Sequence, residues 1–300
     1  MSQPQPSVNF AIRYLTQYHY DGEVVDNLNA LRVRPAANSR QRCDEFSVRL
    51  EPEVRLHRHT DYFGTEVVEF EVSRPHSHLT IDVRARVVTQ PPPTPPEAPW
   101  EALEDPAYRE AGGEFLLQTD ATEQGPLAEL LDATRAAPSP LATLMLITEL
   151  IPDRFEYRQG ATYVDSTIGH LLEMGAGVCQ DFVHLGLWLL RKHRIAARYV
   201  SGYLYAAAAD GRQESIEVDT HAWIEALLPV PGGGEPVWVG ADPTNRGLAG
   251  DTHVKIGHGR HYPDVPPIKG VYRGTATSEH DARVTMTQLT AADPASIARI

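Results

Sequence analysis

The feature that most constrains this chain is a proline-rich stretch about a third of the way along it. Residues 90–100 read QPPPTPPEAPW and contain six prolines. Proline fixes its own φ and lacks the N–H that a helix or a central strand needs, so neither element continues through such a stretch. We therefore predict a stiff, extended linker over 91–100. It divides the 300 residues into two parts, 1–90 and 101–300.

The part before the linker has the pattern of short antiparallel strands. Its runs of β-branched and aromatic residues are 8–20, 28–34, 44–56, 66–72 and 79–88. In IDVRARVV the residues Ile81, Val83, Ala85 and Val87 alternate with polar ones and so fall on one face. Turn signals such as Asp21-Gly22 separate the runs. We predict that residues 1–90 form an antiparallel β-sandwich domain.

The part after the linker changes to a helical period and then returns to strands. Helices are predicted over 126–136, 141–151, 168–174 and 179–193, and strands over 197–205, 221–228, 237–241 and 283–289. A three-glycine turn, 232–234, joins the second and third of these strands as a hairpin. The predicted fold class is α+β, with helices packed on an antiparallel sheet in a domain over 101–300.

Composition excludes several classes of partner. The formal charge is −13, which disfavours binding to nucleic acid and to anionic membranes. The first 20 residues lack a basic segment followed by an apolar run, so no signal peptide is expected. Only Cys43 and Cys179 are cysteines, too few for a disulfide framework. A reduced, cytoplasmic protein is the prediction.

Cys179 has the setting that a nucleophilic thiol requires. The thiolate is the attacking form, and positive charge nearby favours it. Cys179 follows the glycine-rich break 175–177 and opens the apolar helix predicted over 179–193. A helix start supplies about half a positive charge, and its N–H groups can hold the oxyanion of a tetrahedral intermediate.

A base and a residue to orient it are present on the predicted hairpin. His221 opens one strand, and Asp242 closes the next. If the strands pair through the glycine turn, His221 and Asp242 become neighbours. Each residue alone also has a structural explanation: a core thiol, a hydrogen-bonded strand histidine and a turn-forming aspartate. The residues alone leave these alternatives open.

Four short sequence motifs, in this order along the chain, resemble those of one known family, and so do further motifs around them. The four are GVCQDFVHL around Cys179, ARYVSGY, HAWIE from His221 and WVGADPTN around Asp242. The N-terminal words YHY, LRVRP, DYFG and PH, and the late words GRHYPDVPP and GVYRG, are also similar to it. The chain resembles the bacterial transglutaminase-like superfamily over nearly its whole length.

The resemblance implies a papain-like transglutaminase core in which Cys179, His221 and Asp242 form the catalytic triad. It implies acyl transfer at an amide or peptide carbonyl through a Cys thioester. The family includes transglutaminases, cysteine peptidases, amide hydrolases and inactive relatives. We expect a hydrolase acting as a cysteine peptidase or amidase. The alternatives are a protein-glutamine transglutaminase with an amine acceptor and a non-catalytic interaction module.

Further residues near the triad are candidates for the oxyanion site or the pocket. Gln180 and Asp181 follow the nucleophile, and Asp181 is equally a candidate cap of the helix start. Tyr163, in the preceding loop, is a weaker candidate oxyanion donor, as an aromatic is in some relatives. Trp223 is expected to line the pocket or fill the core. His184, five residues after Cys179, is expected to make a structural hydrogen bond.

No metal or cofactor is predicted. His57 and His59, like His76 and His78, share a face at strand spacing, but histidines alone do not specify a metal. The later histidines His253, His258 and His261 fall in a loop, and Asp264 is a candidate for the rim of the cleft. Cys43 is interpreted as structural. The expected partner is a peptide, a protein or an amide-bearing small molecule, and the oligomeric state stays open.

Overall fold

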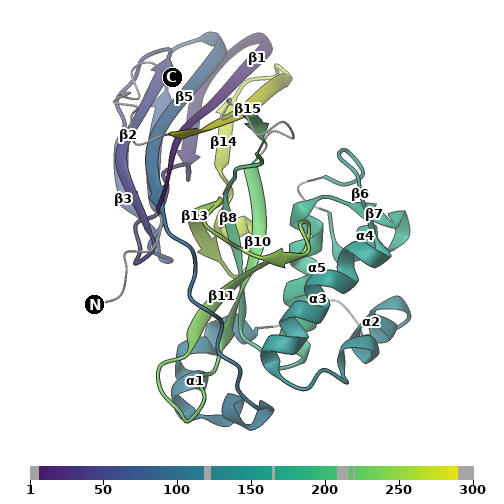
Figure 1. Cartoon of the computed structure of the whole chain (residues 1–300). Helices are drawn as coiled ribbons and strands as arrows, with labels where there is room; N and C mark the ends of the chain where they lie inside the picture. Colours follow the sequence, from purple (N-terminus) through teal and green to yellow (C-terminus); the bar gives the residue numbers. More distant parts are fainter. Residues whose placement is uncertain (1–6, 118–122, 164–165, 208–215, 219, 290–300) are drawn as a thin grey trace.

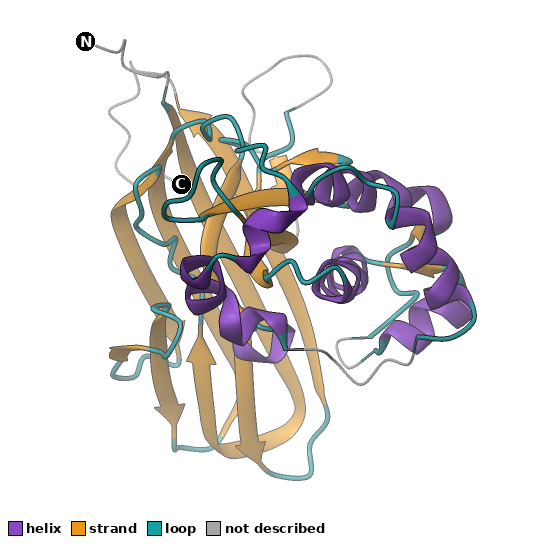
Figure 2. Ribbon diagram, turned by 90° about the horizontal axis from the view of Figure 1, so that it is seen from below, coloured by secondary structure: helices purple, strands orange, loops and turns teal. Residues whose placement is uncertain are grey.

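The computed structural model describes residues 7–117, 123–163, 166–207, 216–218 and 220–289, the backbone alone for 216–218 (Figure 1). Two antiparallel sheets dominate, and the helices α2 to α5 gather on one side of the smaller sheet (Figures 1 and 2). Among these residues no helix combines the length and the apolar character needed to cross a membrane.

The elements alternate in type only after the first five strands. The strands are β1 (Val8–Leu31), β2 (Gln41–Glu51), β3 (His57–Thr60), β4 (Glu66–Val72), β5 (His76–Thr89), β6 (Glu156–Tyr157), β7 (Ala176–Gly177), β8 (Ala197–Leu204), β9 (Ile216–Val218), β10 (Thr220–Leu228), β11 (Val237–Asp242), β12 (Gly247–Leu248), β13 (His253–Gly259), β14 (Ile268–Arg273) and β15 (Ser278–Leu289). The helices are α1 (Pro106–Gly112), α2 (Pro126–Thr134), α3 (Pro140–Arg154), α4 (Ile168–Met174) and α5 (Cys179–Lys192), with short 3₁₀ turns η1 (Trp100–Glu104), η2 (Gly113–Leu116) and η3 (Tyr262–Asp264).

The larger sheet is built around the long strand β1. Its first half pairs with β5 on one side and β15 on the other, giving the order β2-β5-β1-β15-β9. Its second half pairs with β4 and β14, and β3 extends from β4. The register shifts between His19 and Val24, where the strand changes partners. One continuous strand therefore replaces the two that the Asp21-Gly22 signal predicted. The reason is that Asp21 pairs with Thr277 across the sheet instead of forming a turn.

The smaller sheet has the order β12-β11-β10-β8-β13 and carries the helices on one face. Helix α5 lies against β10 and β8, and its backbone comes very close to β10: a Cβ at Gly186 would meet Ile224 Cδ1 at 2.3 Å. The predicted hairpin is confirmed, because Leu228 pairs with Val237 and Ile224 with Ala241. The predicted helices and the strands of this region are all present within a few residues of their expected bounds.

One hydrophobic cluster contains residues of both sheets, and a second joins the helices to the smaller sheet. The predicted inward face of β5, with Ile81 and Val83 fully buried, is confirmed. Phe10 of β1 packs on Tyr205 just after β8, with ring centroids 5.1 Å apart. The hydroxyl of Tyr203 on β8 donates to the carbonyl of Val33 at 2.9 Å. The α+β class is confirmed. The boundaries at 1–90, 91–100 and 101–300 stay predictions, and β14 and β15 add later segments to the N-terminal sheet.

Candidate active site

Cys179 is the first residue of α5, and the chain before it is shaped to place it there. Helix α4 ends at Gly175, whose φ of 61° is the left-handed conformation that glycine adopts without strain. The next two residues form β7, which pairs parallel with β6. Val178 is extended and the helix begins at Cys179. The thiol therefore lies at the positive end of a buried helix.

Asp181 fixes this helix start. Its Oδ2 accepts hydrogen bonds from the Val178 N–H at 2.8 Å and from the Thr162 hydroxyl at 2.5 Å. The side chain is only 3% exposed, and Gly177 leaves room for it, because a Cβ there would lie 2.8 Å from Oδ2. Of the two roles expected for Asp181, these contacts support the cap.

The hairpin brings His221 and Asp242 together, as its predicted pairing requires. The side chains of His221, at the start of β10, and Asp242, at the end of β11, are almost fully buried. His221 Nε2 donates to Asp242 Oδ2 at 2.7 Å. The His221 side chain also forms a hydrogen bond with Cys179. The three residues of the predicted triad thus form one chain of contacts.

Asp242 receives more hydrogen bonds than His221 alone supplies. Its Oδ1 accepts from the N–H groups of Thr244, at 2.9 Å, and Asn245, at 3.2 Å. Its Oδ2 accepts from the Asn245 amide at 2.7 Å and from His253 Nε2 at 3.0 Å, besides His221. A carboxylate with this many donors is strongly held in its ionised form.

The electrostatics of the pair follow from these contacts. Burial lowers the pKa of His221, but the hydrogen bonds to Asp242 and Cys179 outweigh it and raise that pKa to about 10. Burial raises the pKa of Asp242, but the donated hydrogen bonds outweigh it and hold that pKa far below its usual range. The imidazole of His221 is therefore protonated at neutral pH, beside an ionised Asp242.

His221, Asp242 and His253 also bring together donor atoms of the kind that bind metals. One ligand atom from each lies within 4.8 Å of the others. However, the Gly250 N–H donates to His253 Nδ1 at 3.1 Å, so the proton of this ring is on Nε2. A nitrogen that carries a proton and donates it to Asp242 offers no lone pair to a metal ion. The hydrogen-bonded arrangement explains the cluster.

A pocket of about 280 Å³ opens beside Cys179 and His221. Its other lining residues are neutral: Tyr157, Gln159, Gly160, Val178, Gln180, Tyr199, Ser201, Thr220, Ala222, Tyr262 and Pro267. Tyr199 is 2% exposed, and burial raises its pKa well above the usual value, so its hydroxyl stays protonated. A pocket lined by neutral side chains, three of them tyrosines, suits a substrate segment without charged side chains.

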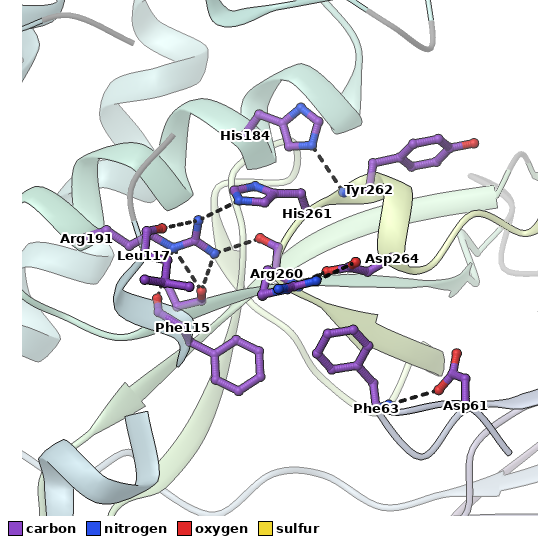
Figure 3. Close-up of polar contacts among 11 residues, drawn as sticks. Asp61, Phe63, Phe115, Leu117, His184, Arg191, Arg260, His261, Tyr262 and Asp264 are labelled. Atoms are coloured by element: carbon purple, nitrogen blue, oxygen red, sulfur yellow. Dashed lines mark hydrogen bonds and ion pairs between the residues drawn. The ribbon is translucent and has the colours of Figure 1, made fainter. Parts of the chain in front are cut away.

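Tyr262 reaches the pocket from η3, and helix α5 anchors that turn (Figure 3). Arg191, near the end of α5, donates to the carbonyls of Arg260 and Ala197 at 2.7 and 2.8 Å, and it contacts His261 Nε2 at 3.3 Å. The Tyr262 N–H donates to His184 Nε2 at 3.4 Å. Burial lowers the pKa of His184 to about 4, which keeps this ring neutral and able to accept. This agrees with the structural role predicted for His184.

The remaining predicted site residues lie in different places. Gln180 lines the pocket. Trp223 is 2% exposed and stacks on His221 at 6.3 Å between ring centroids. Tyr163 is 79% exposed and is not brought to the pocket, whereas Tyr157 of the preceding strand β6 is. Asp264 pairs with Arg260 at 3.0 Å instead of lining the pocket.

The histidines of the N-terminal part and the second cysteine, Cys43, lie outside the pocket. His57 and His59 are exposed on β3, and His76 is buried with its Nε2 at 3.1 Å from the Asn27 amide. Cys43 is half-buried, and its Sγ donates to the Glu45 carbonyl at 3.3 Å. Of the three tyrosines that line the pocket, Tyr157 lies in none of the motifs quoted above, whereas Tyr199 lies in ARYVSGY and Tyr262 in GRHYPDVPP. None of the three was assigned a role from the sequence.

Comparison with known families matches two parts of the chain. The profile of the bacterial transglutaminase-like N-terminal region matches residues 10–88. The profile of the transglutaminase-like superfamily matches residues 128–243, which include all three triad positions.

Individual relatives are similar over almost the whole length. An uncharacterized protein of Mycobacterium tuberculosis is 35% identical over 294 residues, which cover 92% of this chain and 91% of that protein. An uncharacterized protein of Mycobacterium leprae is 32% identical over 276 residues. The crystal structure of a proposed cysteine protease from Cytophaga hutchinsonii superposes with a TM-score of 0.74. It covers 95% of this chain and 92% of its own, at 22% identity, which shows a common fold.

Proposed function

Because the chain belongs to the transglutaminase-like superfamily, we propose that it is a Cys-His-Asp acyl-transfer enzyme that acts on an amide or peptide carbonyl. The observation that carries the proposal is the continuous set of contacts from Cys179 to His221 to Asp242, with His221 Nε2 at 2.7 Å from Asp242 Oδ2. The pocket beside Cys179 supplies a place for the substrate.

The first half of the proposed reaction forms a thioester. The Cys179 thiolate attacks the carbonyl carbon, and the carbonyl π electrons move to oxygen to give a tetrahedral oxyanion. The oxyanion then collapses and breaks the C–N bond, while the His221 imidazolium gives its proton to the leaving amine. Asp242 stabilises the imidazolium and fixes the ring.

The second half releases the acyl group. Now neutral, His221 takes a proton from water or from an amine as that group attacks the thioester. Collapse of the second tetrahedral intermediate expels the Cys179 thiolate and yields an acid or a new amide. The scheme changes no oxidation state and uses only groups of the chain, the substrate and water or an amine, so it requires no cofactor.

The start of α5 is the proposed oxyanion site. The first helical hydrogen bonds are donated by the Asp181 and Phe182 N–H groups to the Val178 carbonyl. The N–H groups of Cys179 and Gln180 precede them at the positive end of the helix, directly beside the thiol. We assign the oxyanion to these two groups.

Water is the acceptor that we favour, which makes the protein a cysteine peptidase or amidase. A crosslinking enzyme among cytoplasmic proteins would modify its own surroundings, and this argues for hydrolysis. The test is incubation with a glutaminyl peptide and a fluorescent amine. Release of free acid is expected. Incorporation of the amine with little free acid would identify a transglutaminase instead.

A non-catalytic interaction module is the alternative of another class, and thiol reactivity separates it from an enzyme. We expect iodoacetamide to label Cys179 at pH 6 much faster than it labels a model thiol. Cys43 is a reference within the same chain, because burial raises the pKa of its thiol. Peptide mapping by mass spectrometry measures both sites. Equal labelling of Cys179 and the model thiol would rule out an activated nucleophile.

The cytoplasm is the proposed location. Both cysteines are free in the structure, as expected in a reducing compartment. Fractionation of cells that express the tagged protein tests this, and recovery in a periplasmic or secreted fraction would contradict it.

A further inference from the structure

His253 was expected to lie in a loop outside the site, yet it contacts the triad directly. It is the first residue of β13, at the edge of the smaller sheet. Its Nε2 lies 3.0 Å from Asp242 Oδ2, the same oxygen that accepts from His221 Nε2 at 2.7 Å. Its side chain is 9% exposed. Two imidazoles therefore share one carboxylate oxygen in a site almost closed to water.

The other ring nitrogen shows which protonation state His253 has. The Gly250 N–H donates to Nδ1 at 3.1 Å, and a protonated Nδ1 could not accept it. The ring is consequently neutral, with its single proton on Nε2 and directed at Asp242. Trp223 holds this orientation, because its ring meets the His253 ring edge-on at 5.3 Å.

We propose that His253 is a positioning residue of the triad, whose Nε2–H shares Asp242 Oδ2 with His221 and so limits how strongly Asp242 stabilises the His221 imidazolium. The inference rests on the proposed acyl transfer, because that reaction requires His221 to give its proton to the leaving amine. A carboxylate oxygen that serves several donors is a weaker acceptor for each of them.

The consequence concerns the general-acid step. An imidazolium that Asp242 stabilises too strongly gives up the proton of its other ring nitrogen slowly, since proton transfer is most effective when the acid's pKa lies near the working pH. The pKa of His221 is already raised to about 10 by its partners. Without the donor on His253, Asp242 would stabilise the His221 imidazolium more strongly and raise that pKa further.

The other charged groups near His253 are one carboxylate and several cations, so their net charge is positive. Glu225 and Lys255 line the same small polar cavity as His253, together with Arg40. Lys255 Nζ lies 2.6 Å from Glu225 Oε2, and Arg198 Nε lies 2.7 Å from the same atom. On the opposite side Cys179 contacts His221.

The experiment compares His253→Leu, which removes the donor, with His253→Gln, whose amide can replace the Nε2–H. The pKa of His221 is measured by NMR titration of protein with isotope-labelled histidine, a readout that needs no substrate. We expect His253→Leu to raise the pKa of His221 by about one unit, and His253→Gln to restore it. For wild-type protein the nitrogen shifts of His253 should show a protonated Nε2 and a bare Nδ1.

Kinetics provide the second readout on the amide substrate. For His253→Leu we expect kcat to fall about 10-fold, KM to change little and the alkaline limb of kcat/KM to move to higher pH. His258, on the same strand, is the matched control. Its Nε2 contacts Arg198 at 3.1 Å, away from Asp242, so His258→Gln should leave the pKa of His221 unchanged.

Several results would overturn the proposal. These are a protonated Nδ1 on His253, an unchanged or lowered pKa of His221 in folded His253→Leu, or equal effects of the leucine and glutamine variants. Should His253→Leu fail to fold, two measurements still test the proposal: the nitrogen shifts of His253 in the wild type, and the pKa of His221 in His253→Gln. Absence of any turnover by the wild type would refute the acyl-transfer proposal, while the NMR measurements would continue to test His253.

Discussion

At the scale of single residues, the site is a set of buried charges that stabilise each other. His221 is 9% exposed and Asp242 is fully buried, so neither charge is solvated by bulk water. Breaking such a pair by removing one partner costs about 3–5 kcal/mol, because the other charge stays buried. The surrounding donors on Thr244, Asn245 and His253 reduce the cost of keeping Asp242 ionised.

Replacing Asp242 by asparagine should shift the pH dependence of the reaction downward. Asp242→Asn removes the negative charge that favours the His221 imidazolium, so the pKa of His221 falls from about 10. The alkaline limb of kcat/KM should then move to lower pH, and kcat should fall about 10⁴-fold. Asp264→Asn is the control, since Asp264 pairs with Arg260 outside the triad. An unchanged alkaline limb in Asp242→Asn would disprove the assigned pairing.

The pair should also give the fold a measurable pH dependence. The pKa of His221 is raised from 6.5 to about 10 on folding, so its contribution is full below pH 6.5 and is lost as pH rises to about 10. We expect the wild type to lose more unfolding free energy than His221→Gln between pH 6 and pH 10, by at most about 5 kcal/mol. Urea unfolding at several pH values measures this. Parallel curves for the two proteins would contradict it.

At the scale of elements, α5 organises both sides of the pocket. Its first residue is Cys179, and Arg191 near its end binds the Arg260 carbonyl and thereby holds the turn that carries Tyr262. Glycine at position 186 lets the helix lie directly on β10, the strand that begins beside His221. A displacement of this one helix would therefore move the nucleophile and the opposite wall of the pocket together.

The cap on α5 can be separated from any direct chemical role of Asp181. Asp181→Ala removes the acceptor for the Val178 N–H and the Thr162 hydroxyl, and we expect a loss of about 1–3 kcal/mol in unfolding free energy. Asp181→Asn keeps an acceptor oxygen, so stability and the alkylation rate of Cys179 should be largely retained. If the asparagine variant is stable but has lost turnover, Asp181 acts in the chemistry rather than as a cap.

Local patterns in the sequence were sufficient to predict α5, the β10–β11 hairpin and the proximity of His221 to Asp242. The strand β13 was missed because Gly257 and Gly259 are unusual in strands. Here Gly257 is required by Thr65, whose Oγ1 would lie 2.3 Å from a Cβ at that position. Such a reason depends on a residue about 190 positions away (257 − 65) and leaves no local signal. The contact of Arg191 with the Arg260 carbonyl, 69 positions away, was missed for the same cause. His253 lies only 11 positions from Asp242, and its contact was missed because β13 was interpreted as a loop.

At the scale of the whole molecule, the two sheets depend on a common core. Phe10 is fully buried against Tyr205, and Gln41 hydrogen-bonds the backbone of Lys255 through both ends of its amide. Contacts of this kind link the N-terminal sheet to the sheet that carries the triad. We expect the chain to unfold in one cooperative transition.

A substitution in β1 should accordingly be detected by tryptophans that lie outside the hydrophobic cluster of Phe10. All four tryptophans lie after residue 99, so their fluorescence reports on the part with the triad. Phe10→Ala should lower the midpoint of that fluorescence transition and cost about 3–5 kcal/mol. Leu28→Ala is the control, because Leu28 is 48% exposed. If Phe10→Ala leaves the tryptophan transition in place, the two parts unfold independently.

The pairing of β1 with β15 also determines when the larger sheet can be completed during synthesis. Ala11 pairs with Thr287, 276 positions later (287 − 11), so the ribosome makes β1 long before its neighbour exists. Until β15 emerges, one side of β1 lacks its partner strand, and the hydrophobic cluster between the two sheets lacks Val284 and Met286. The nascent chain therefore carries Cys179 through the synthesis of more than 100 later residues (287 − 179) before β1 gains this partner strand.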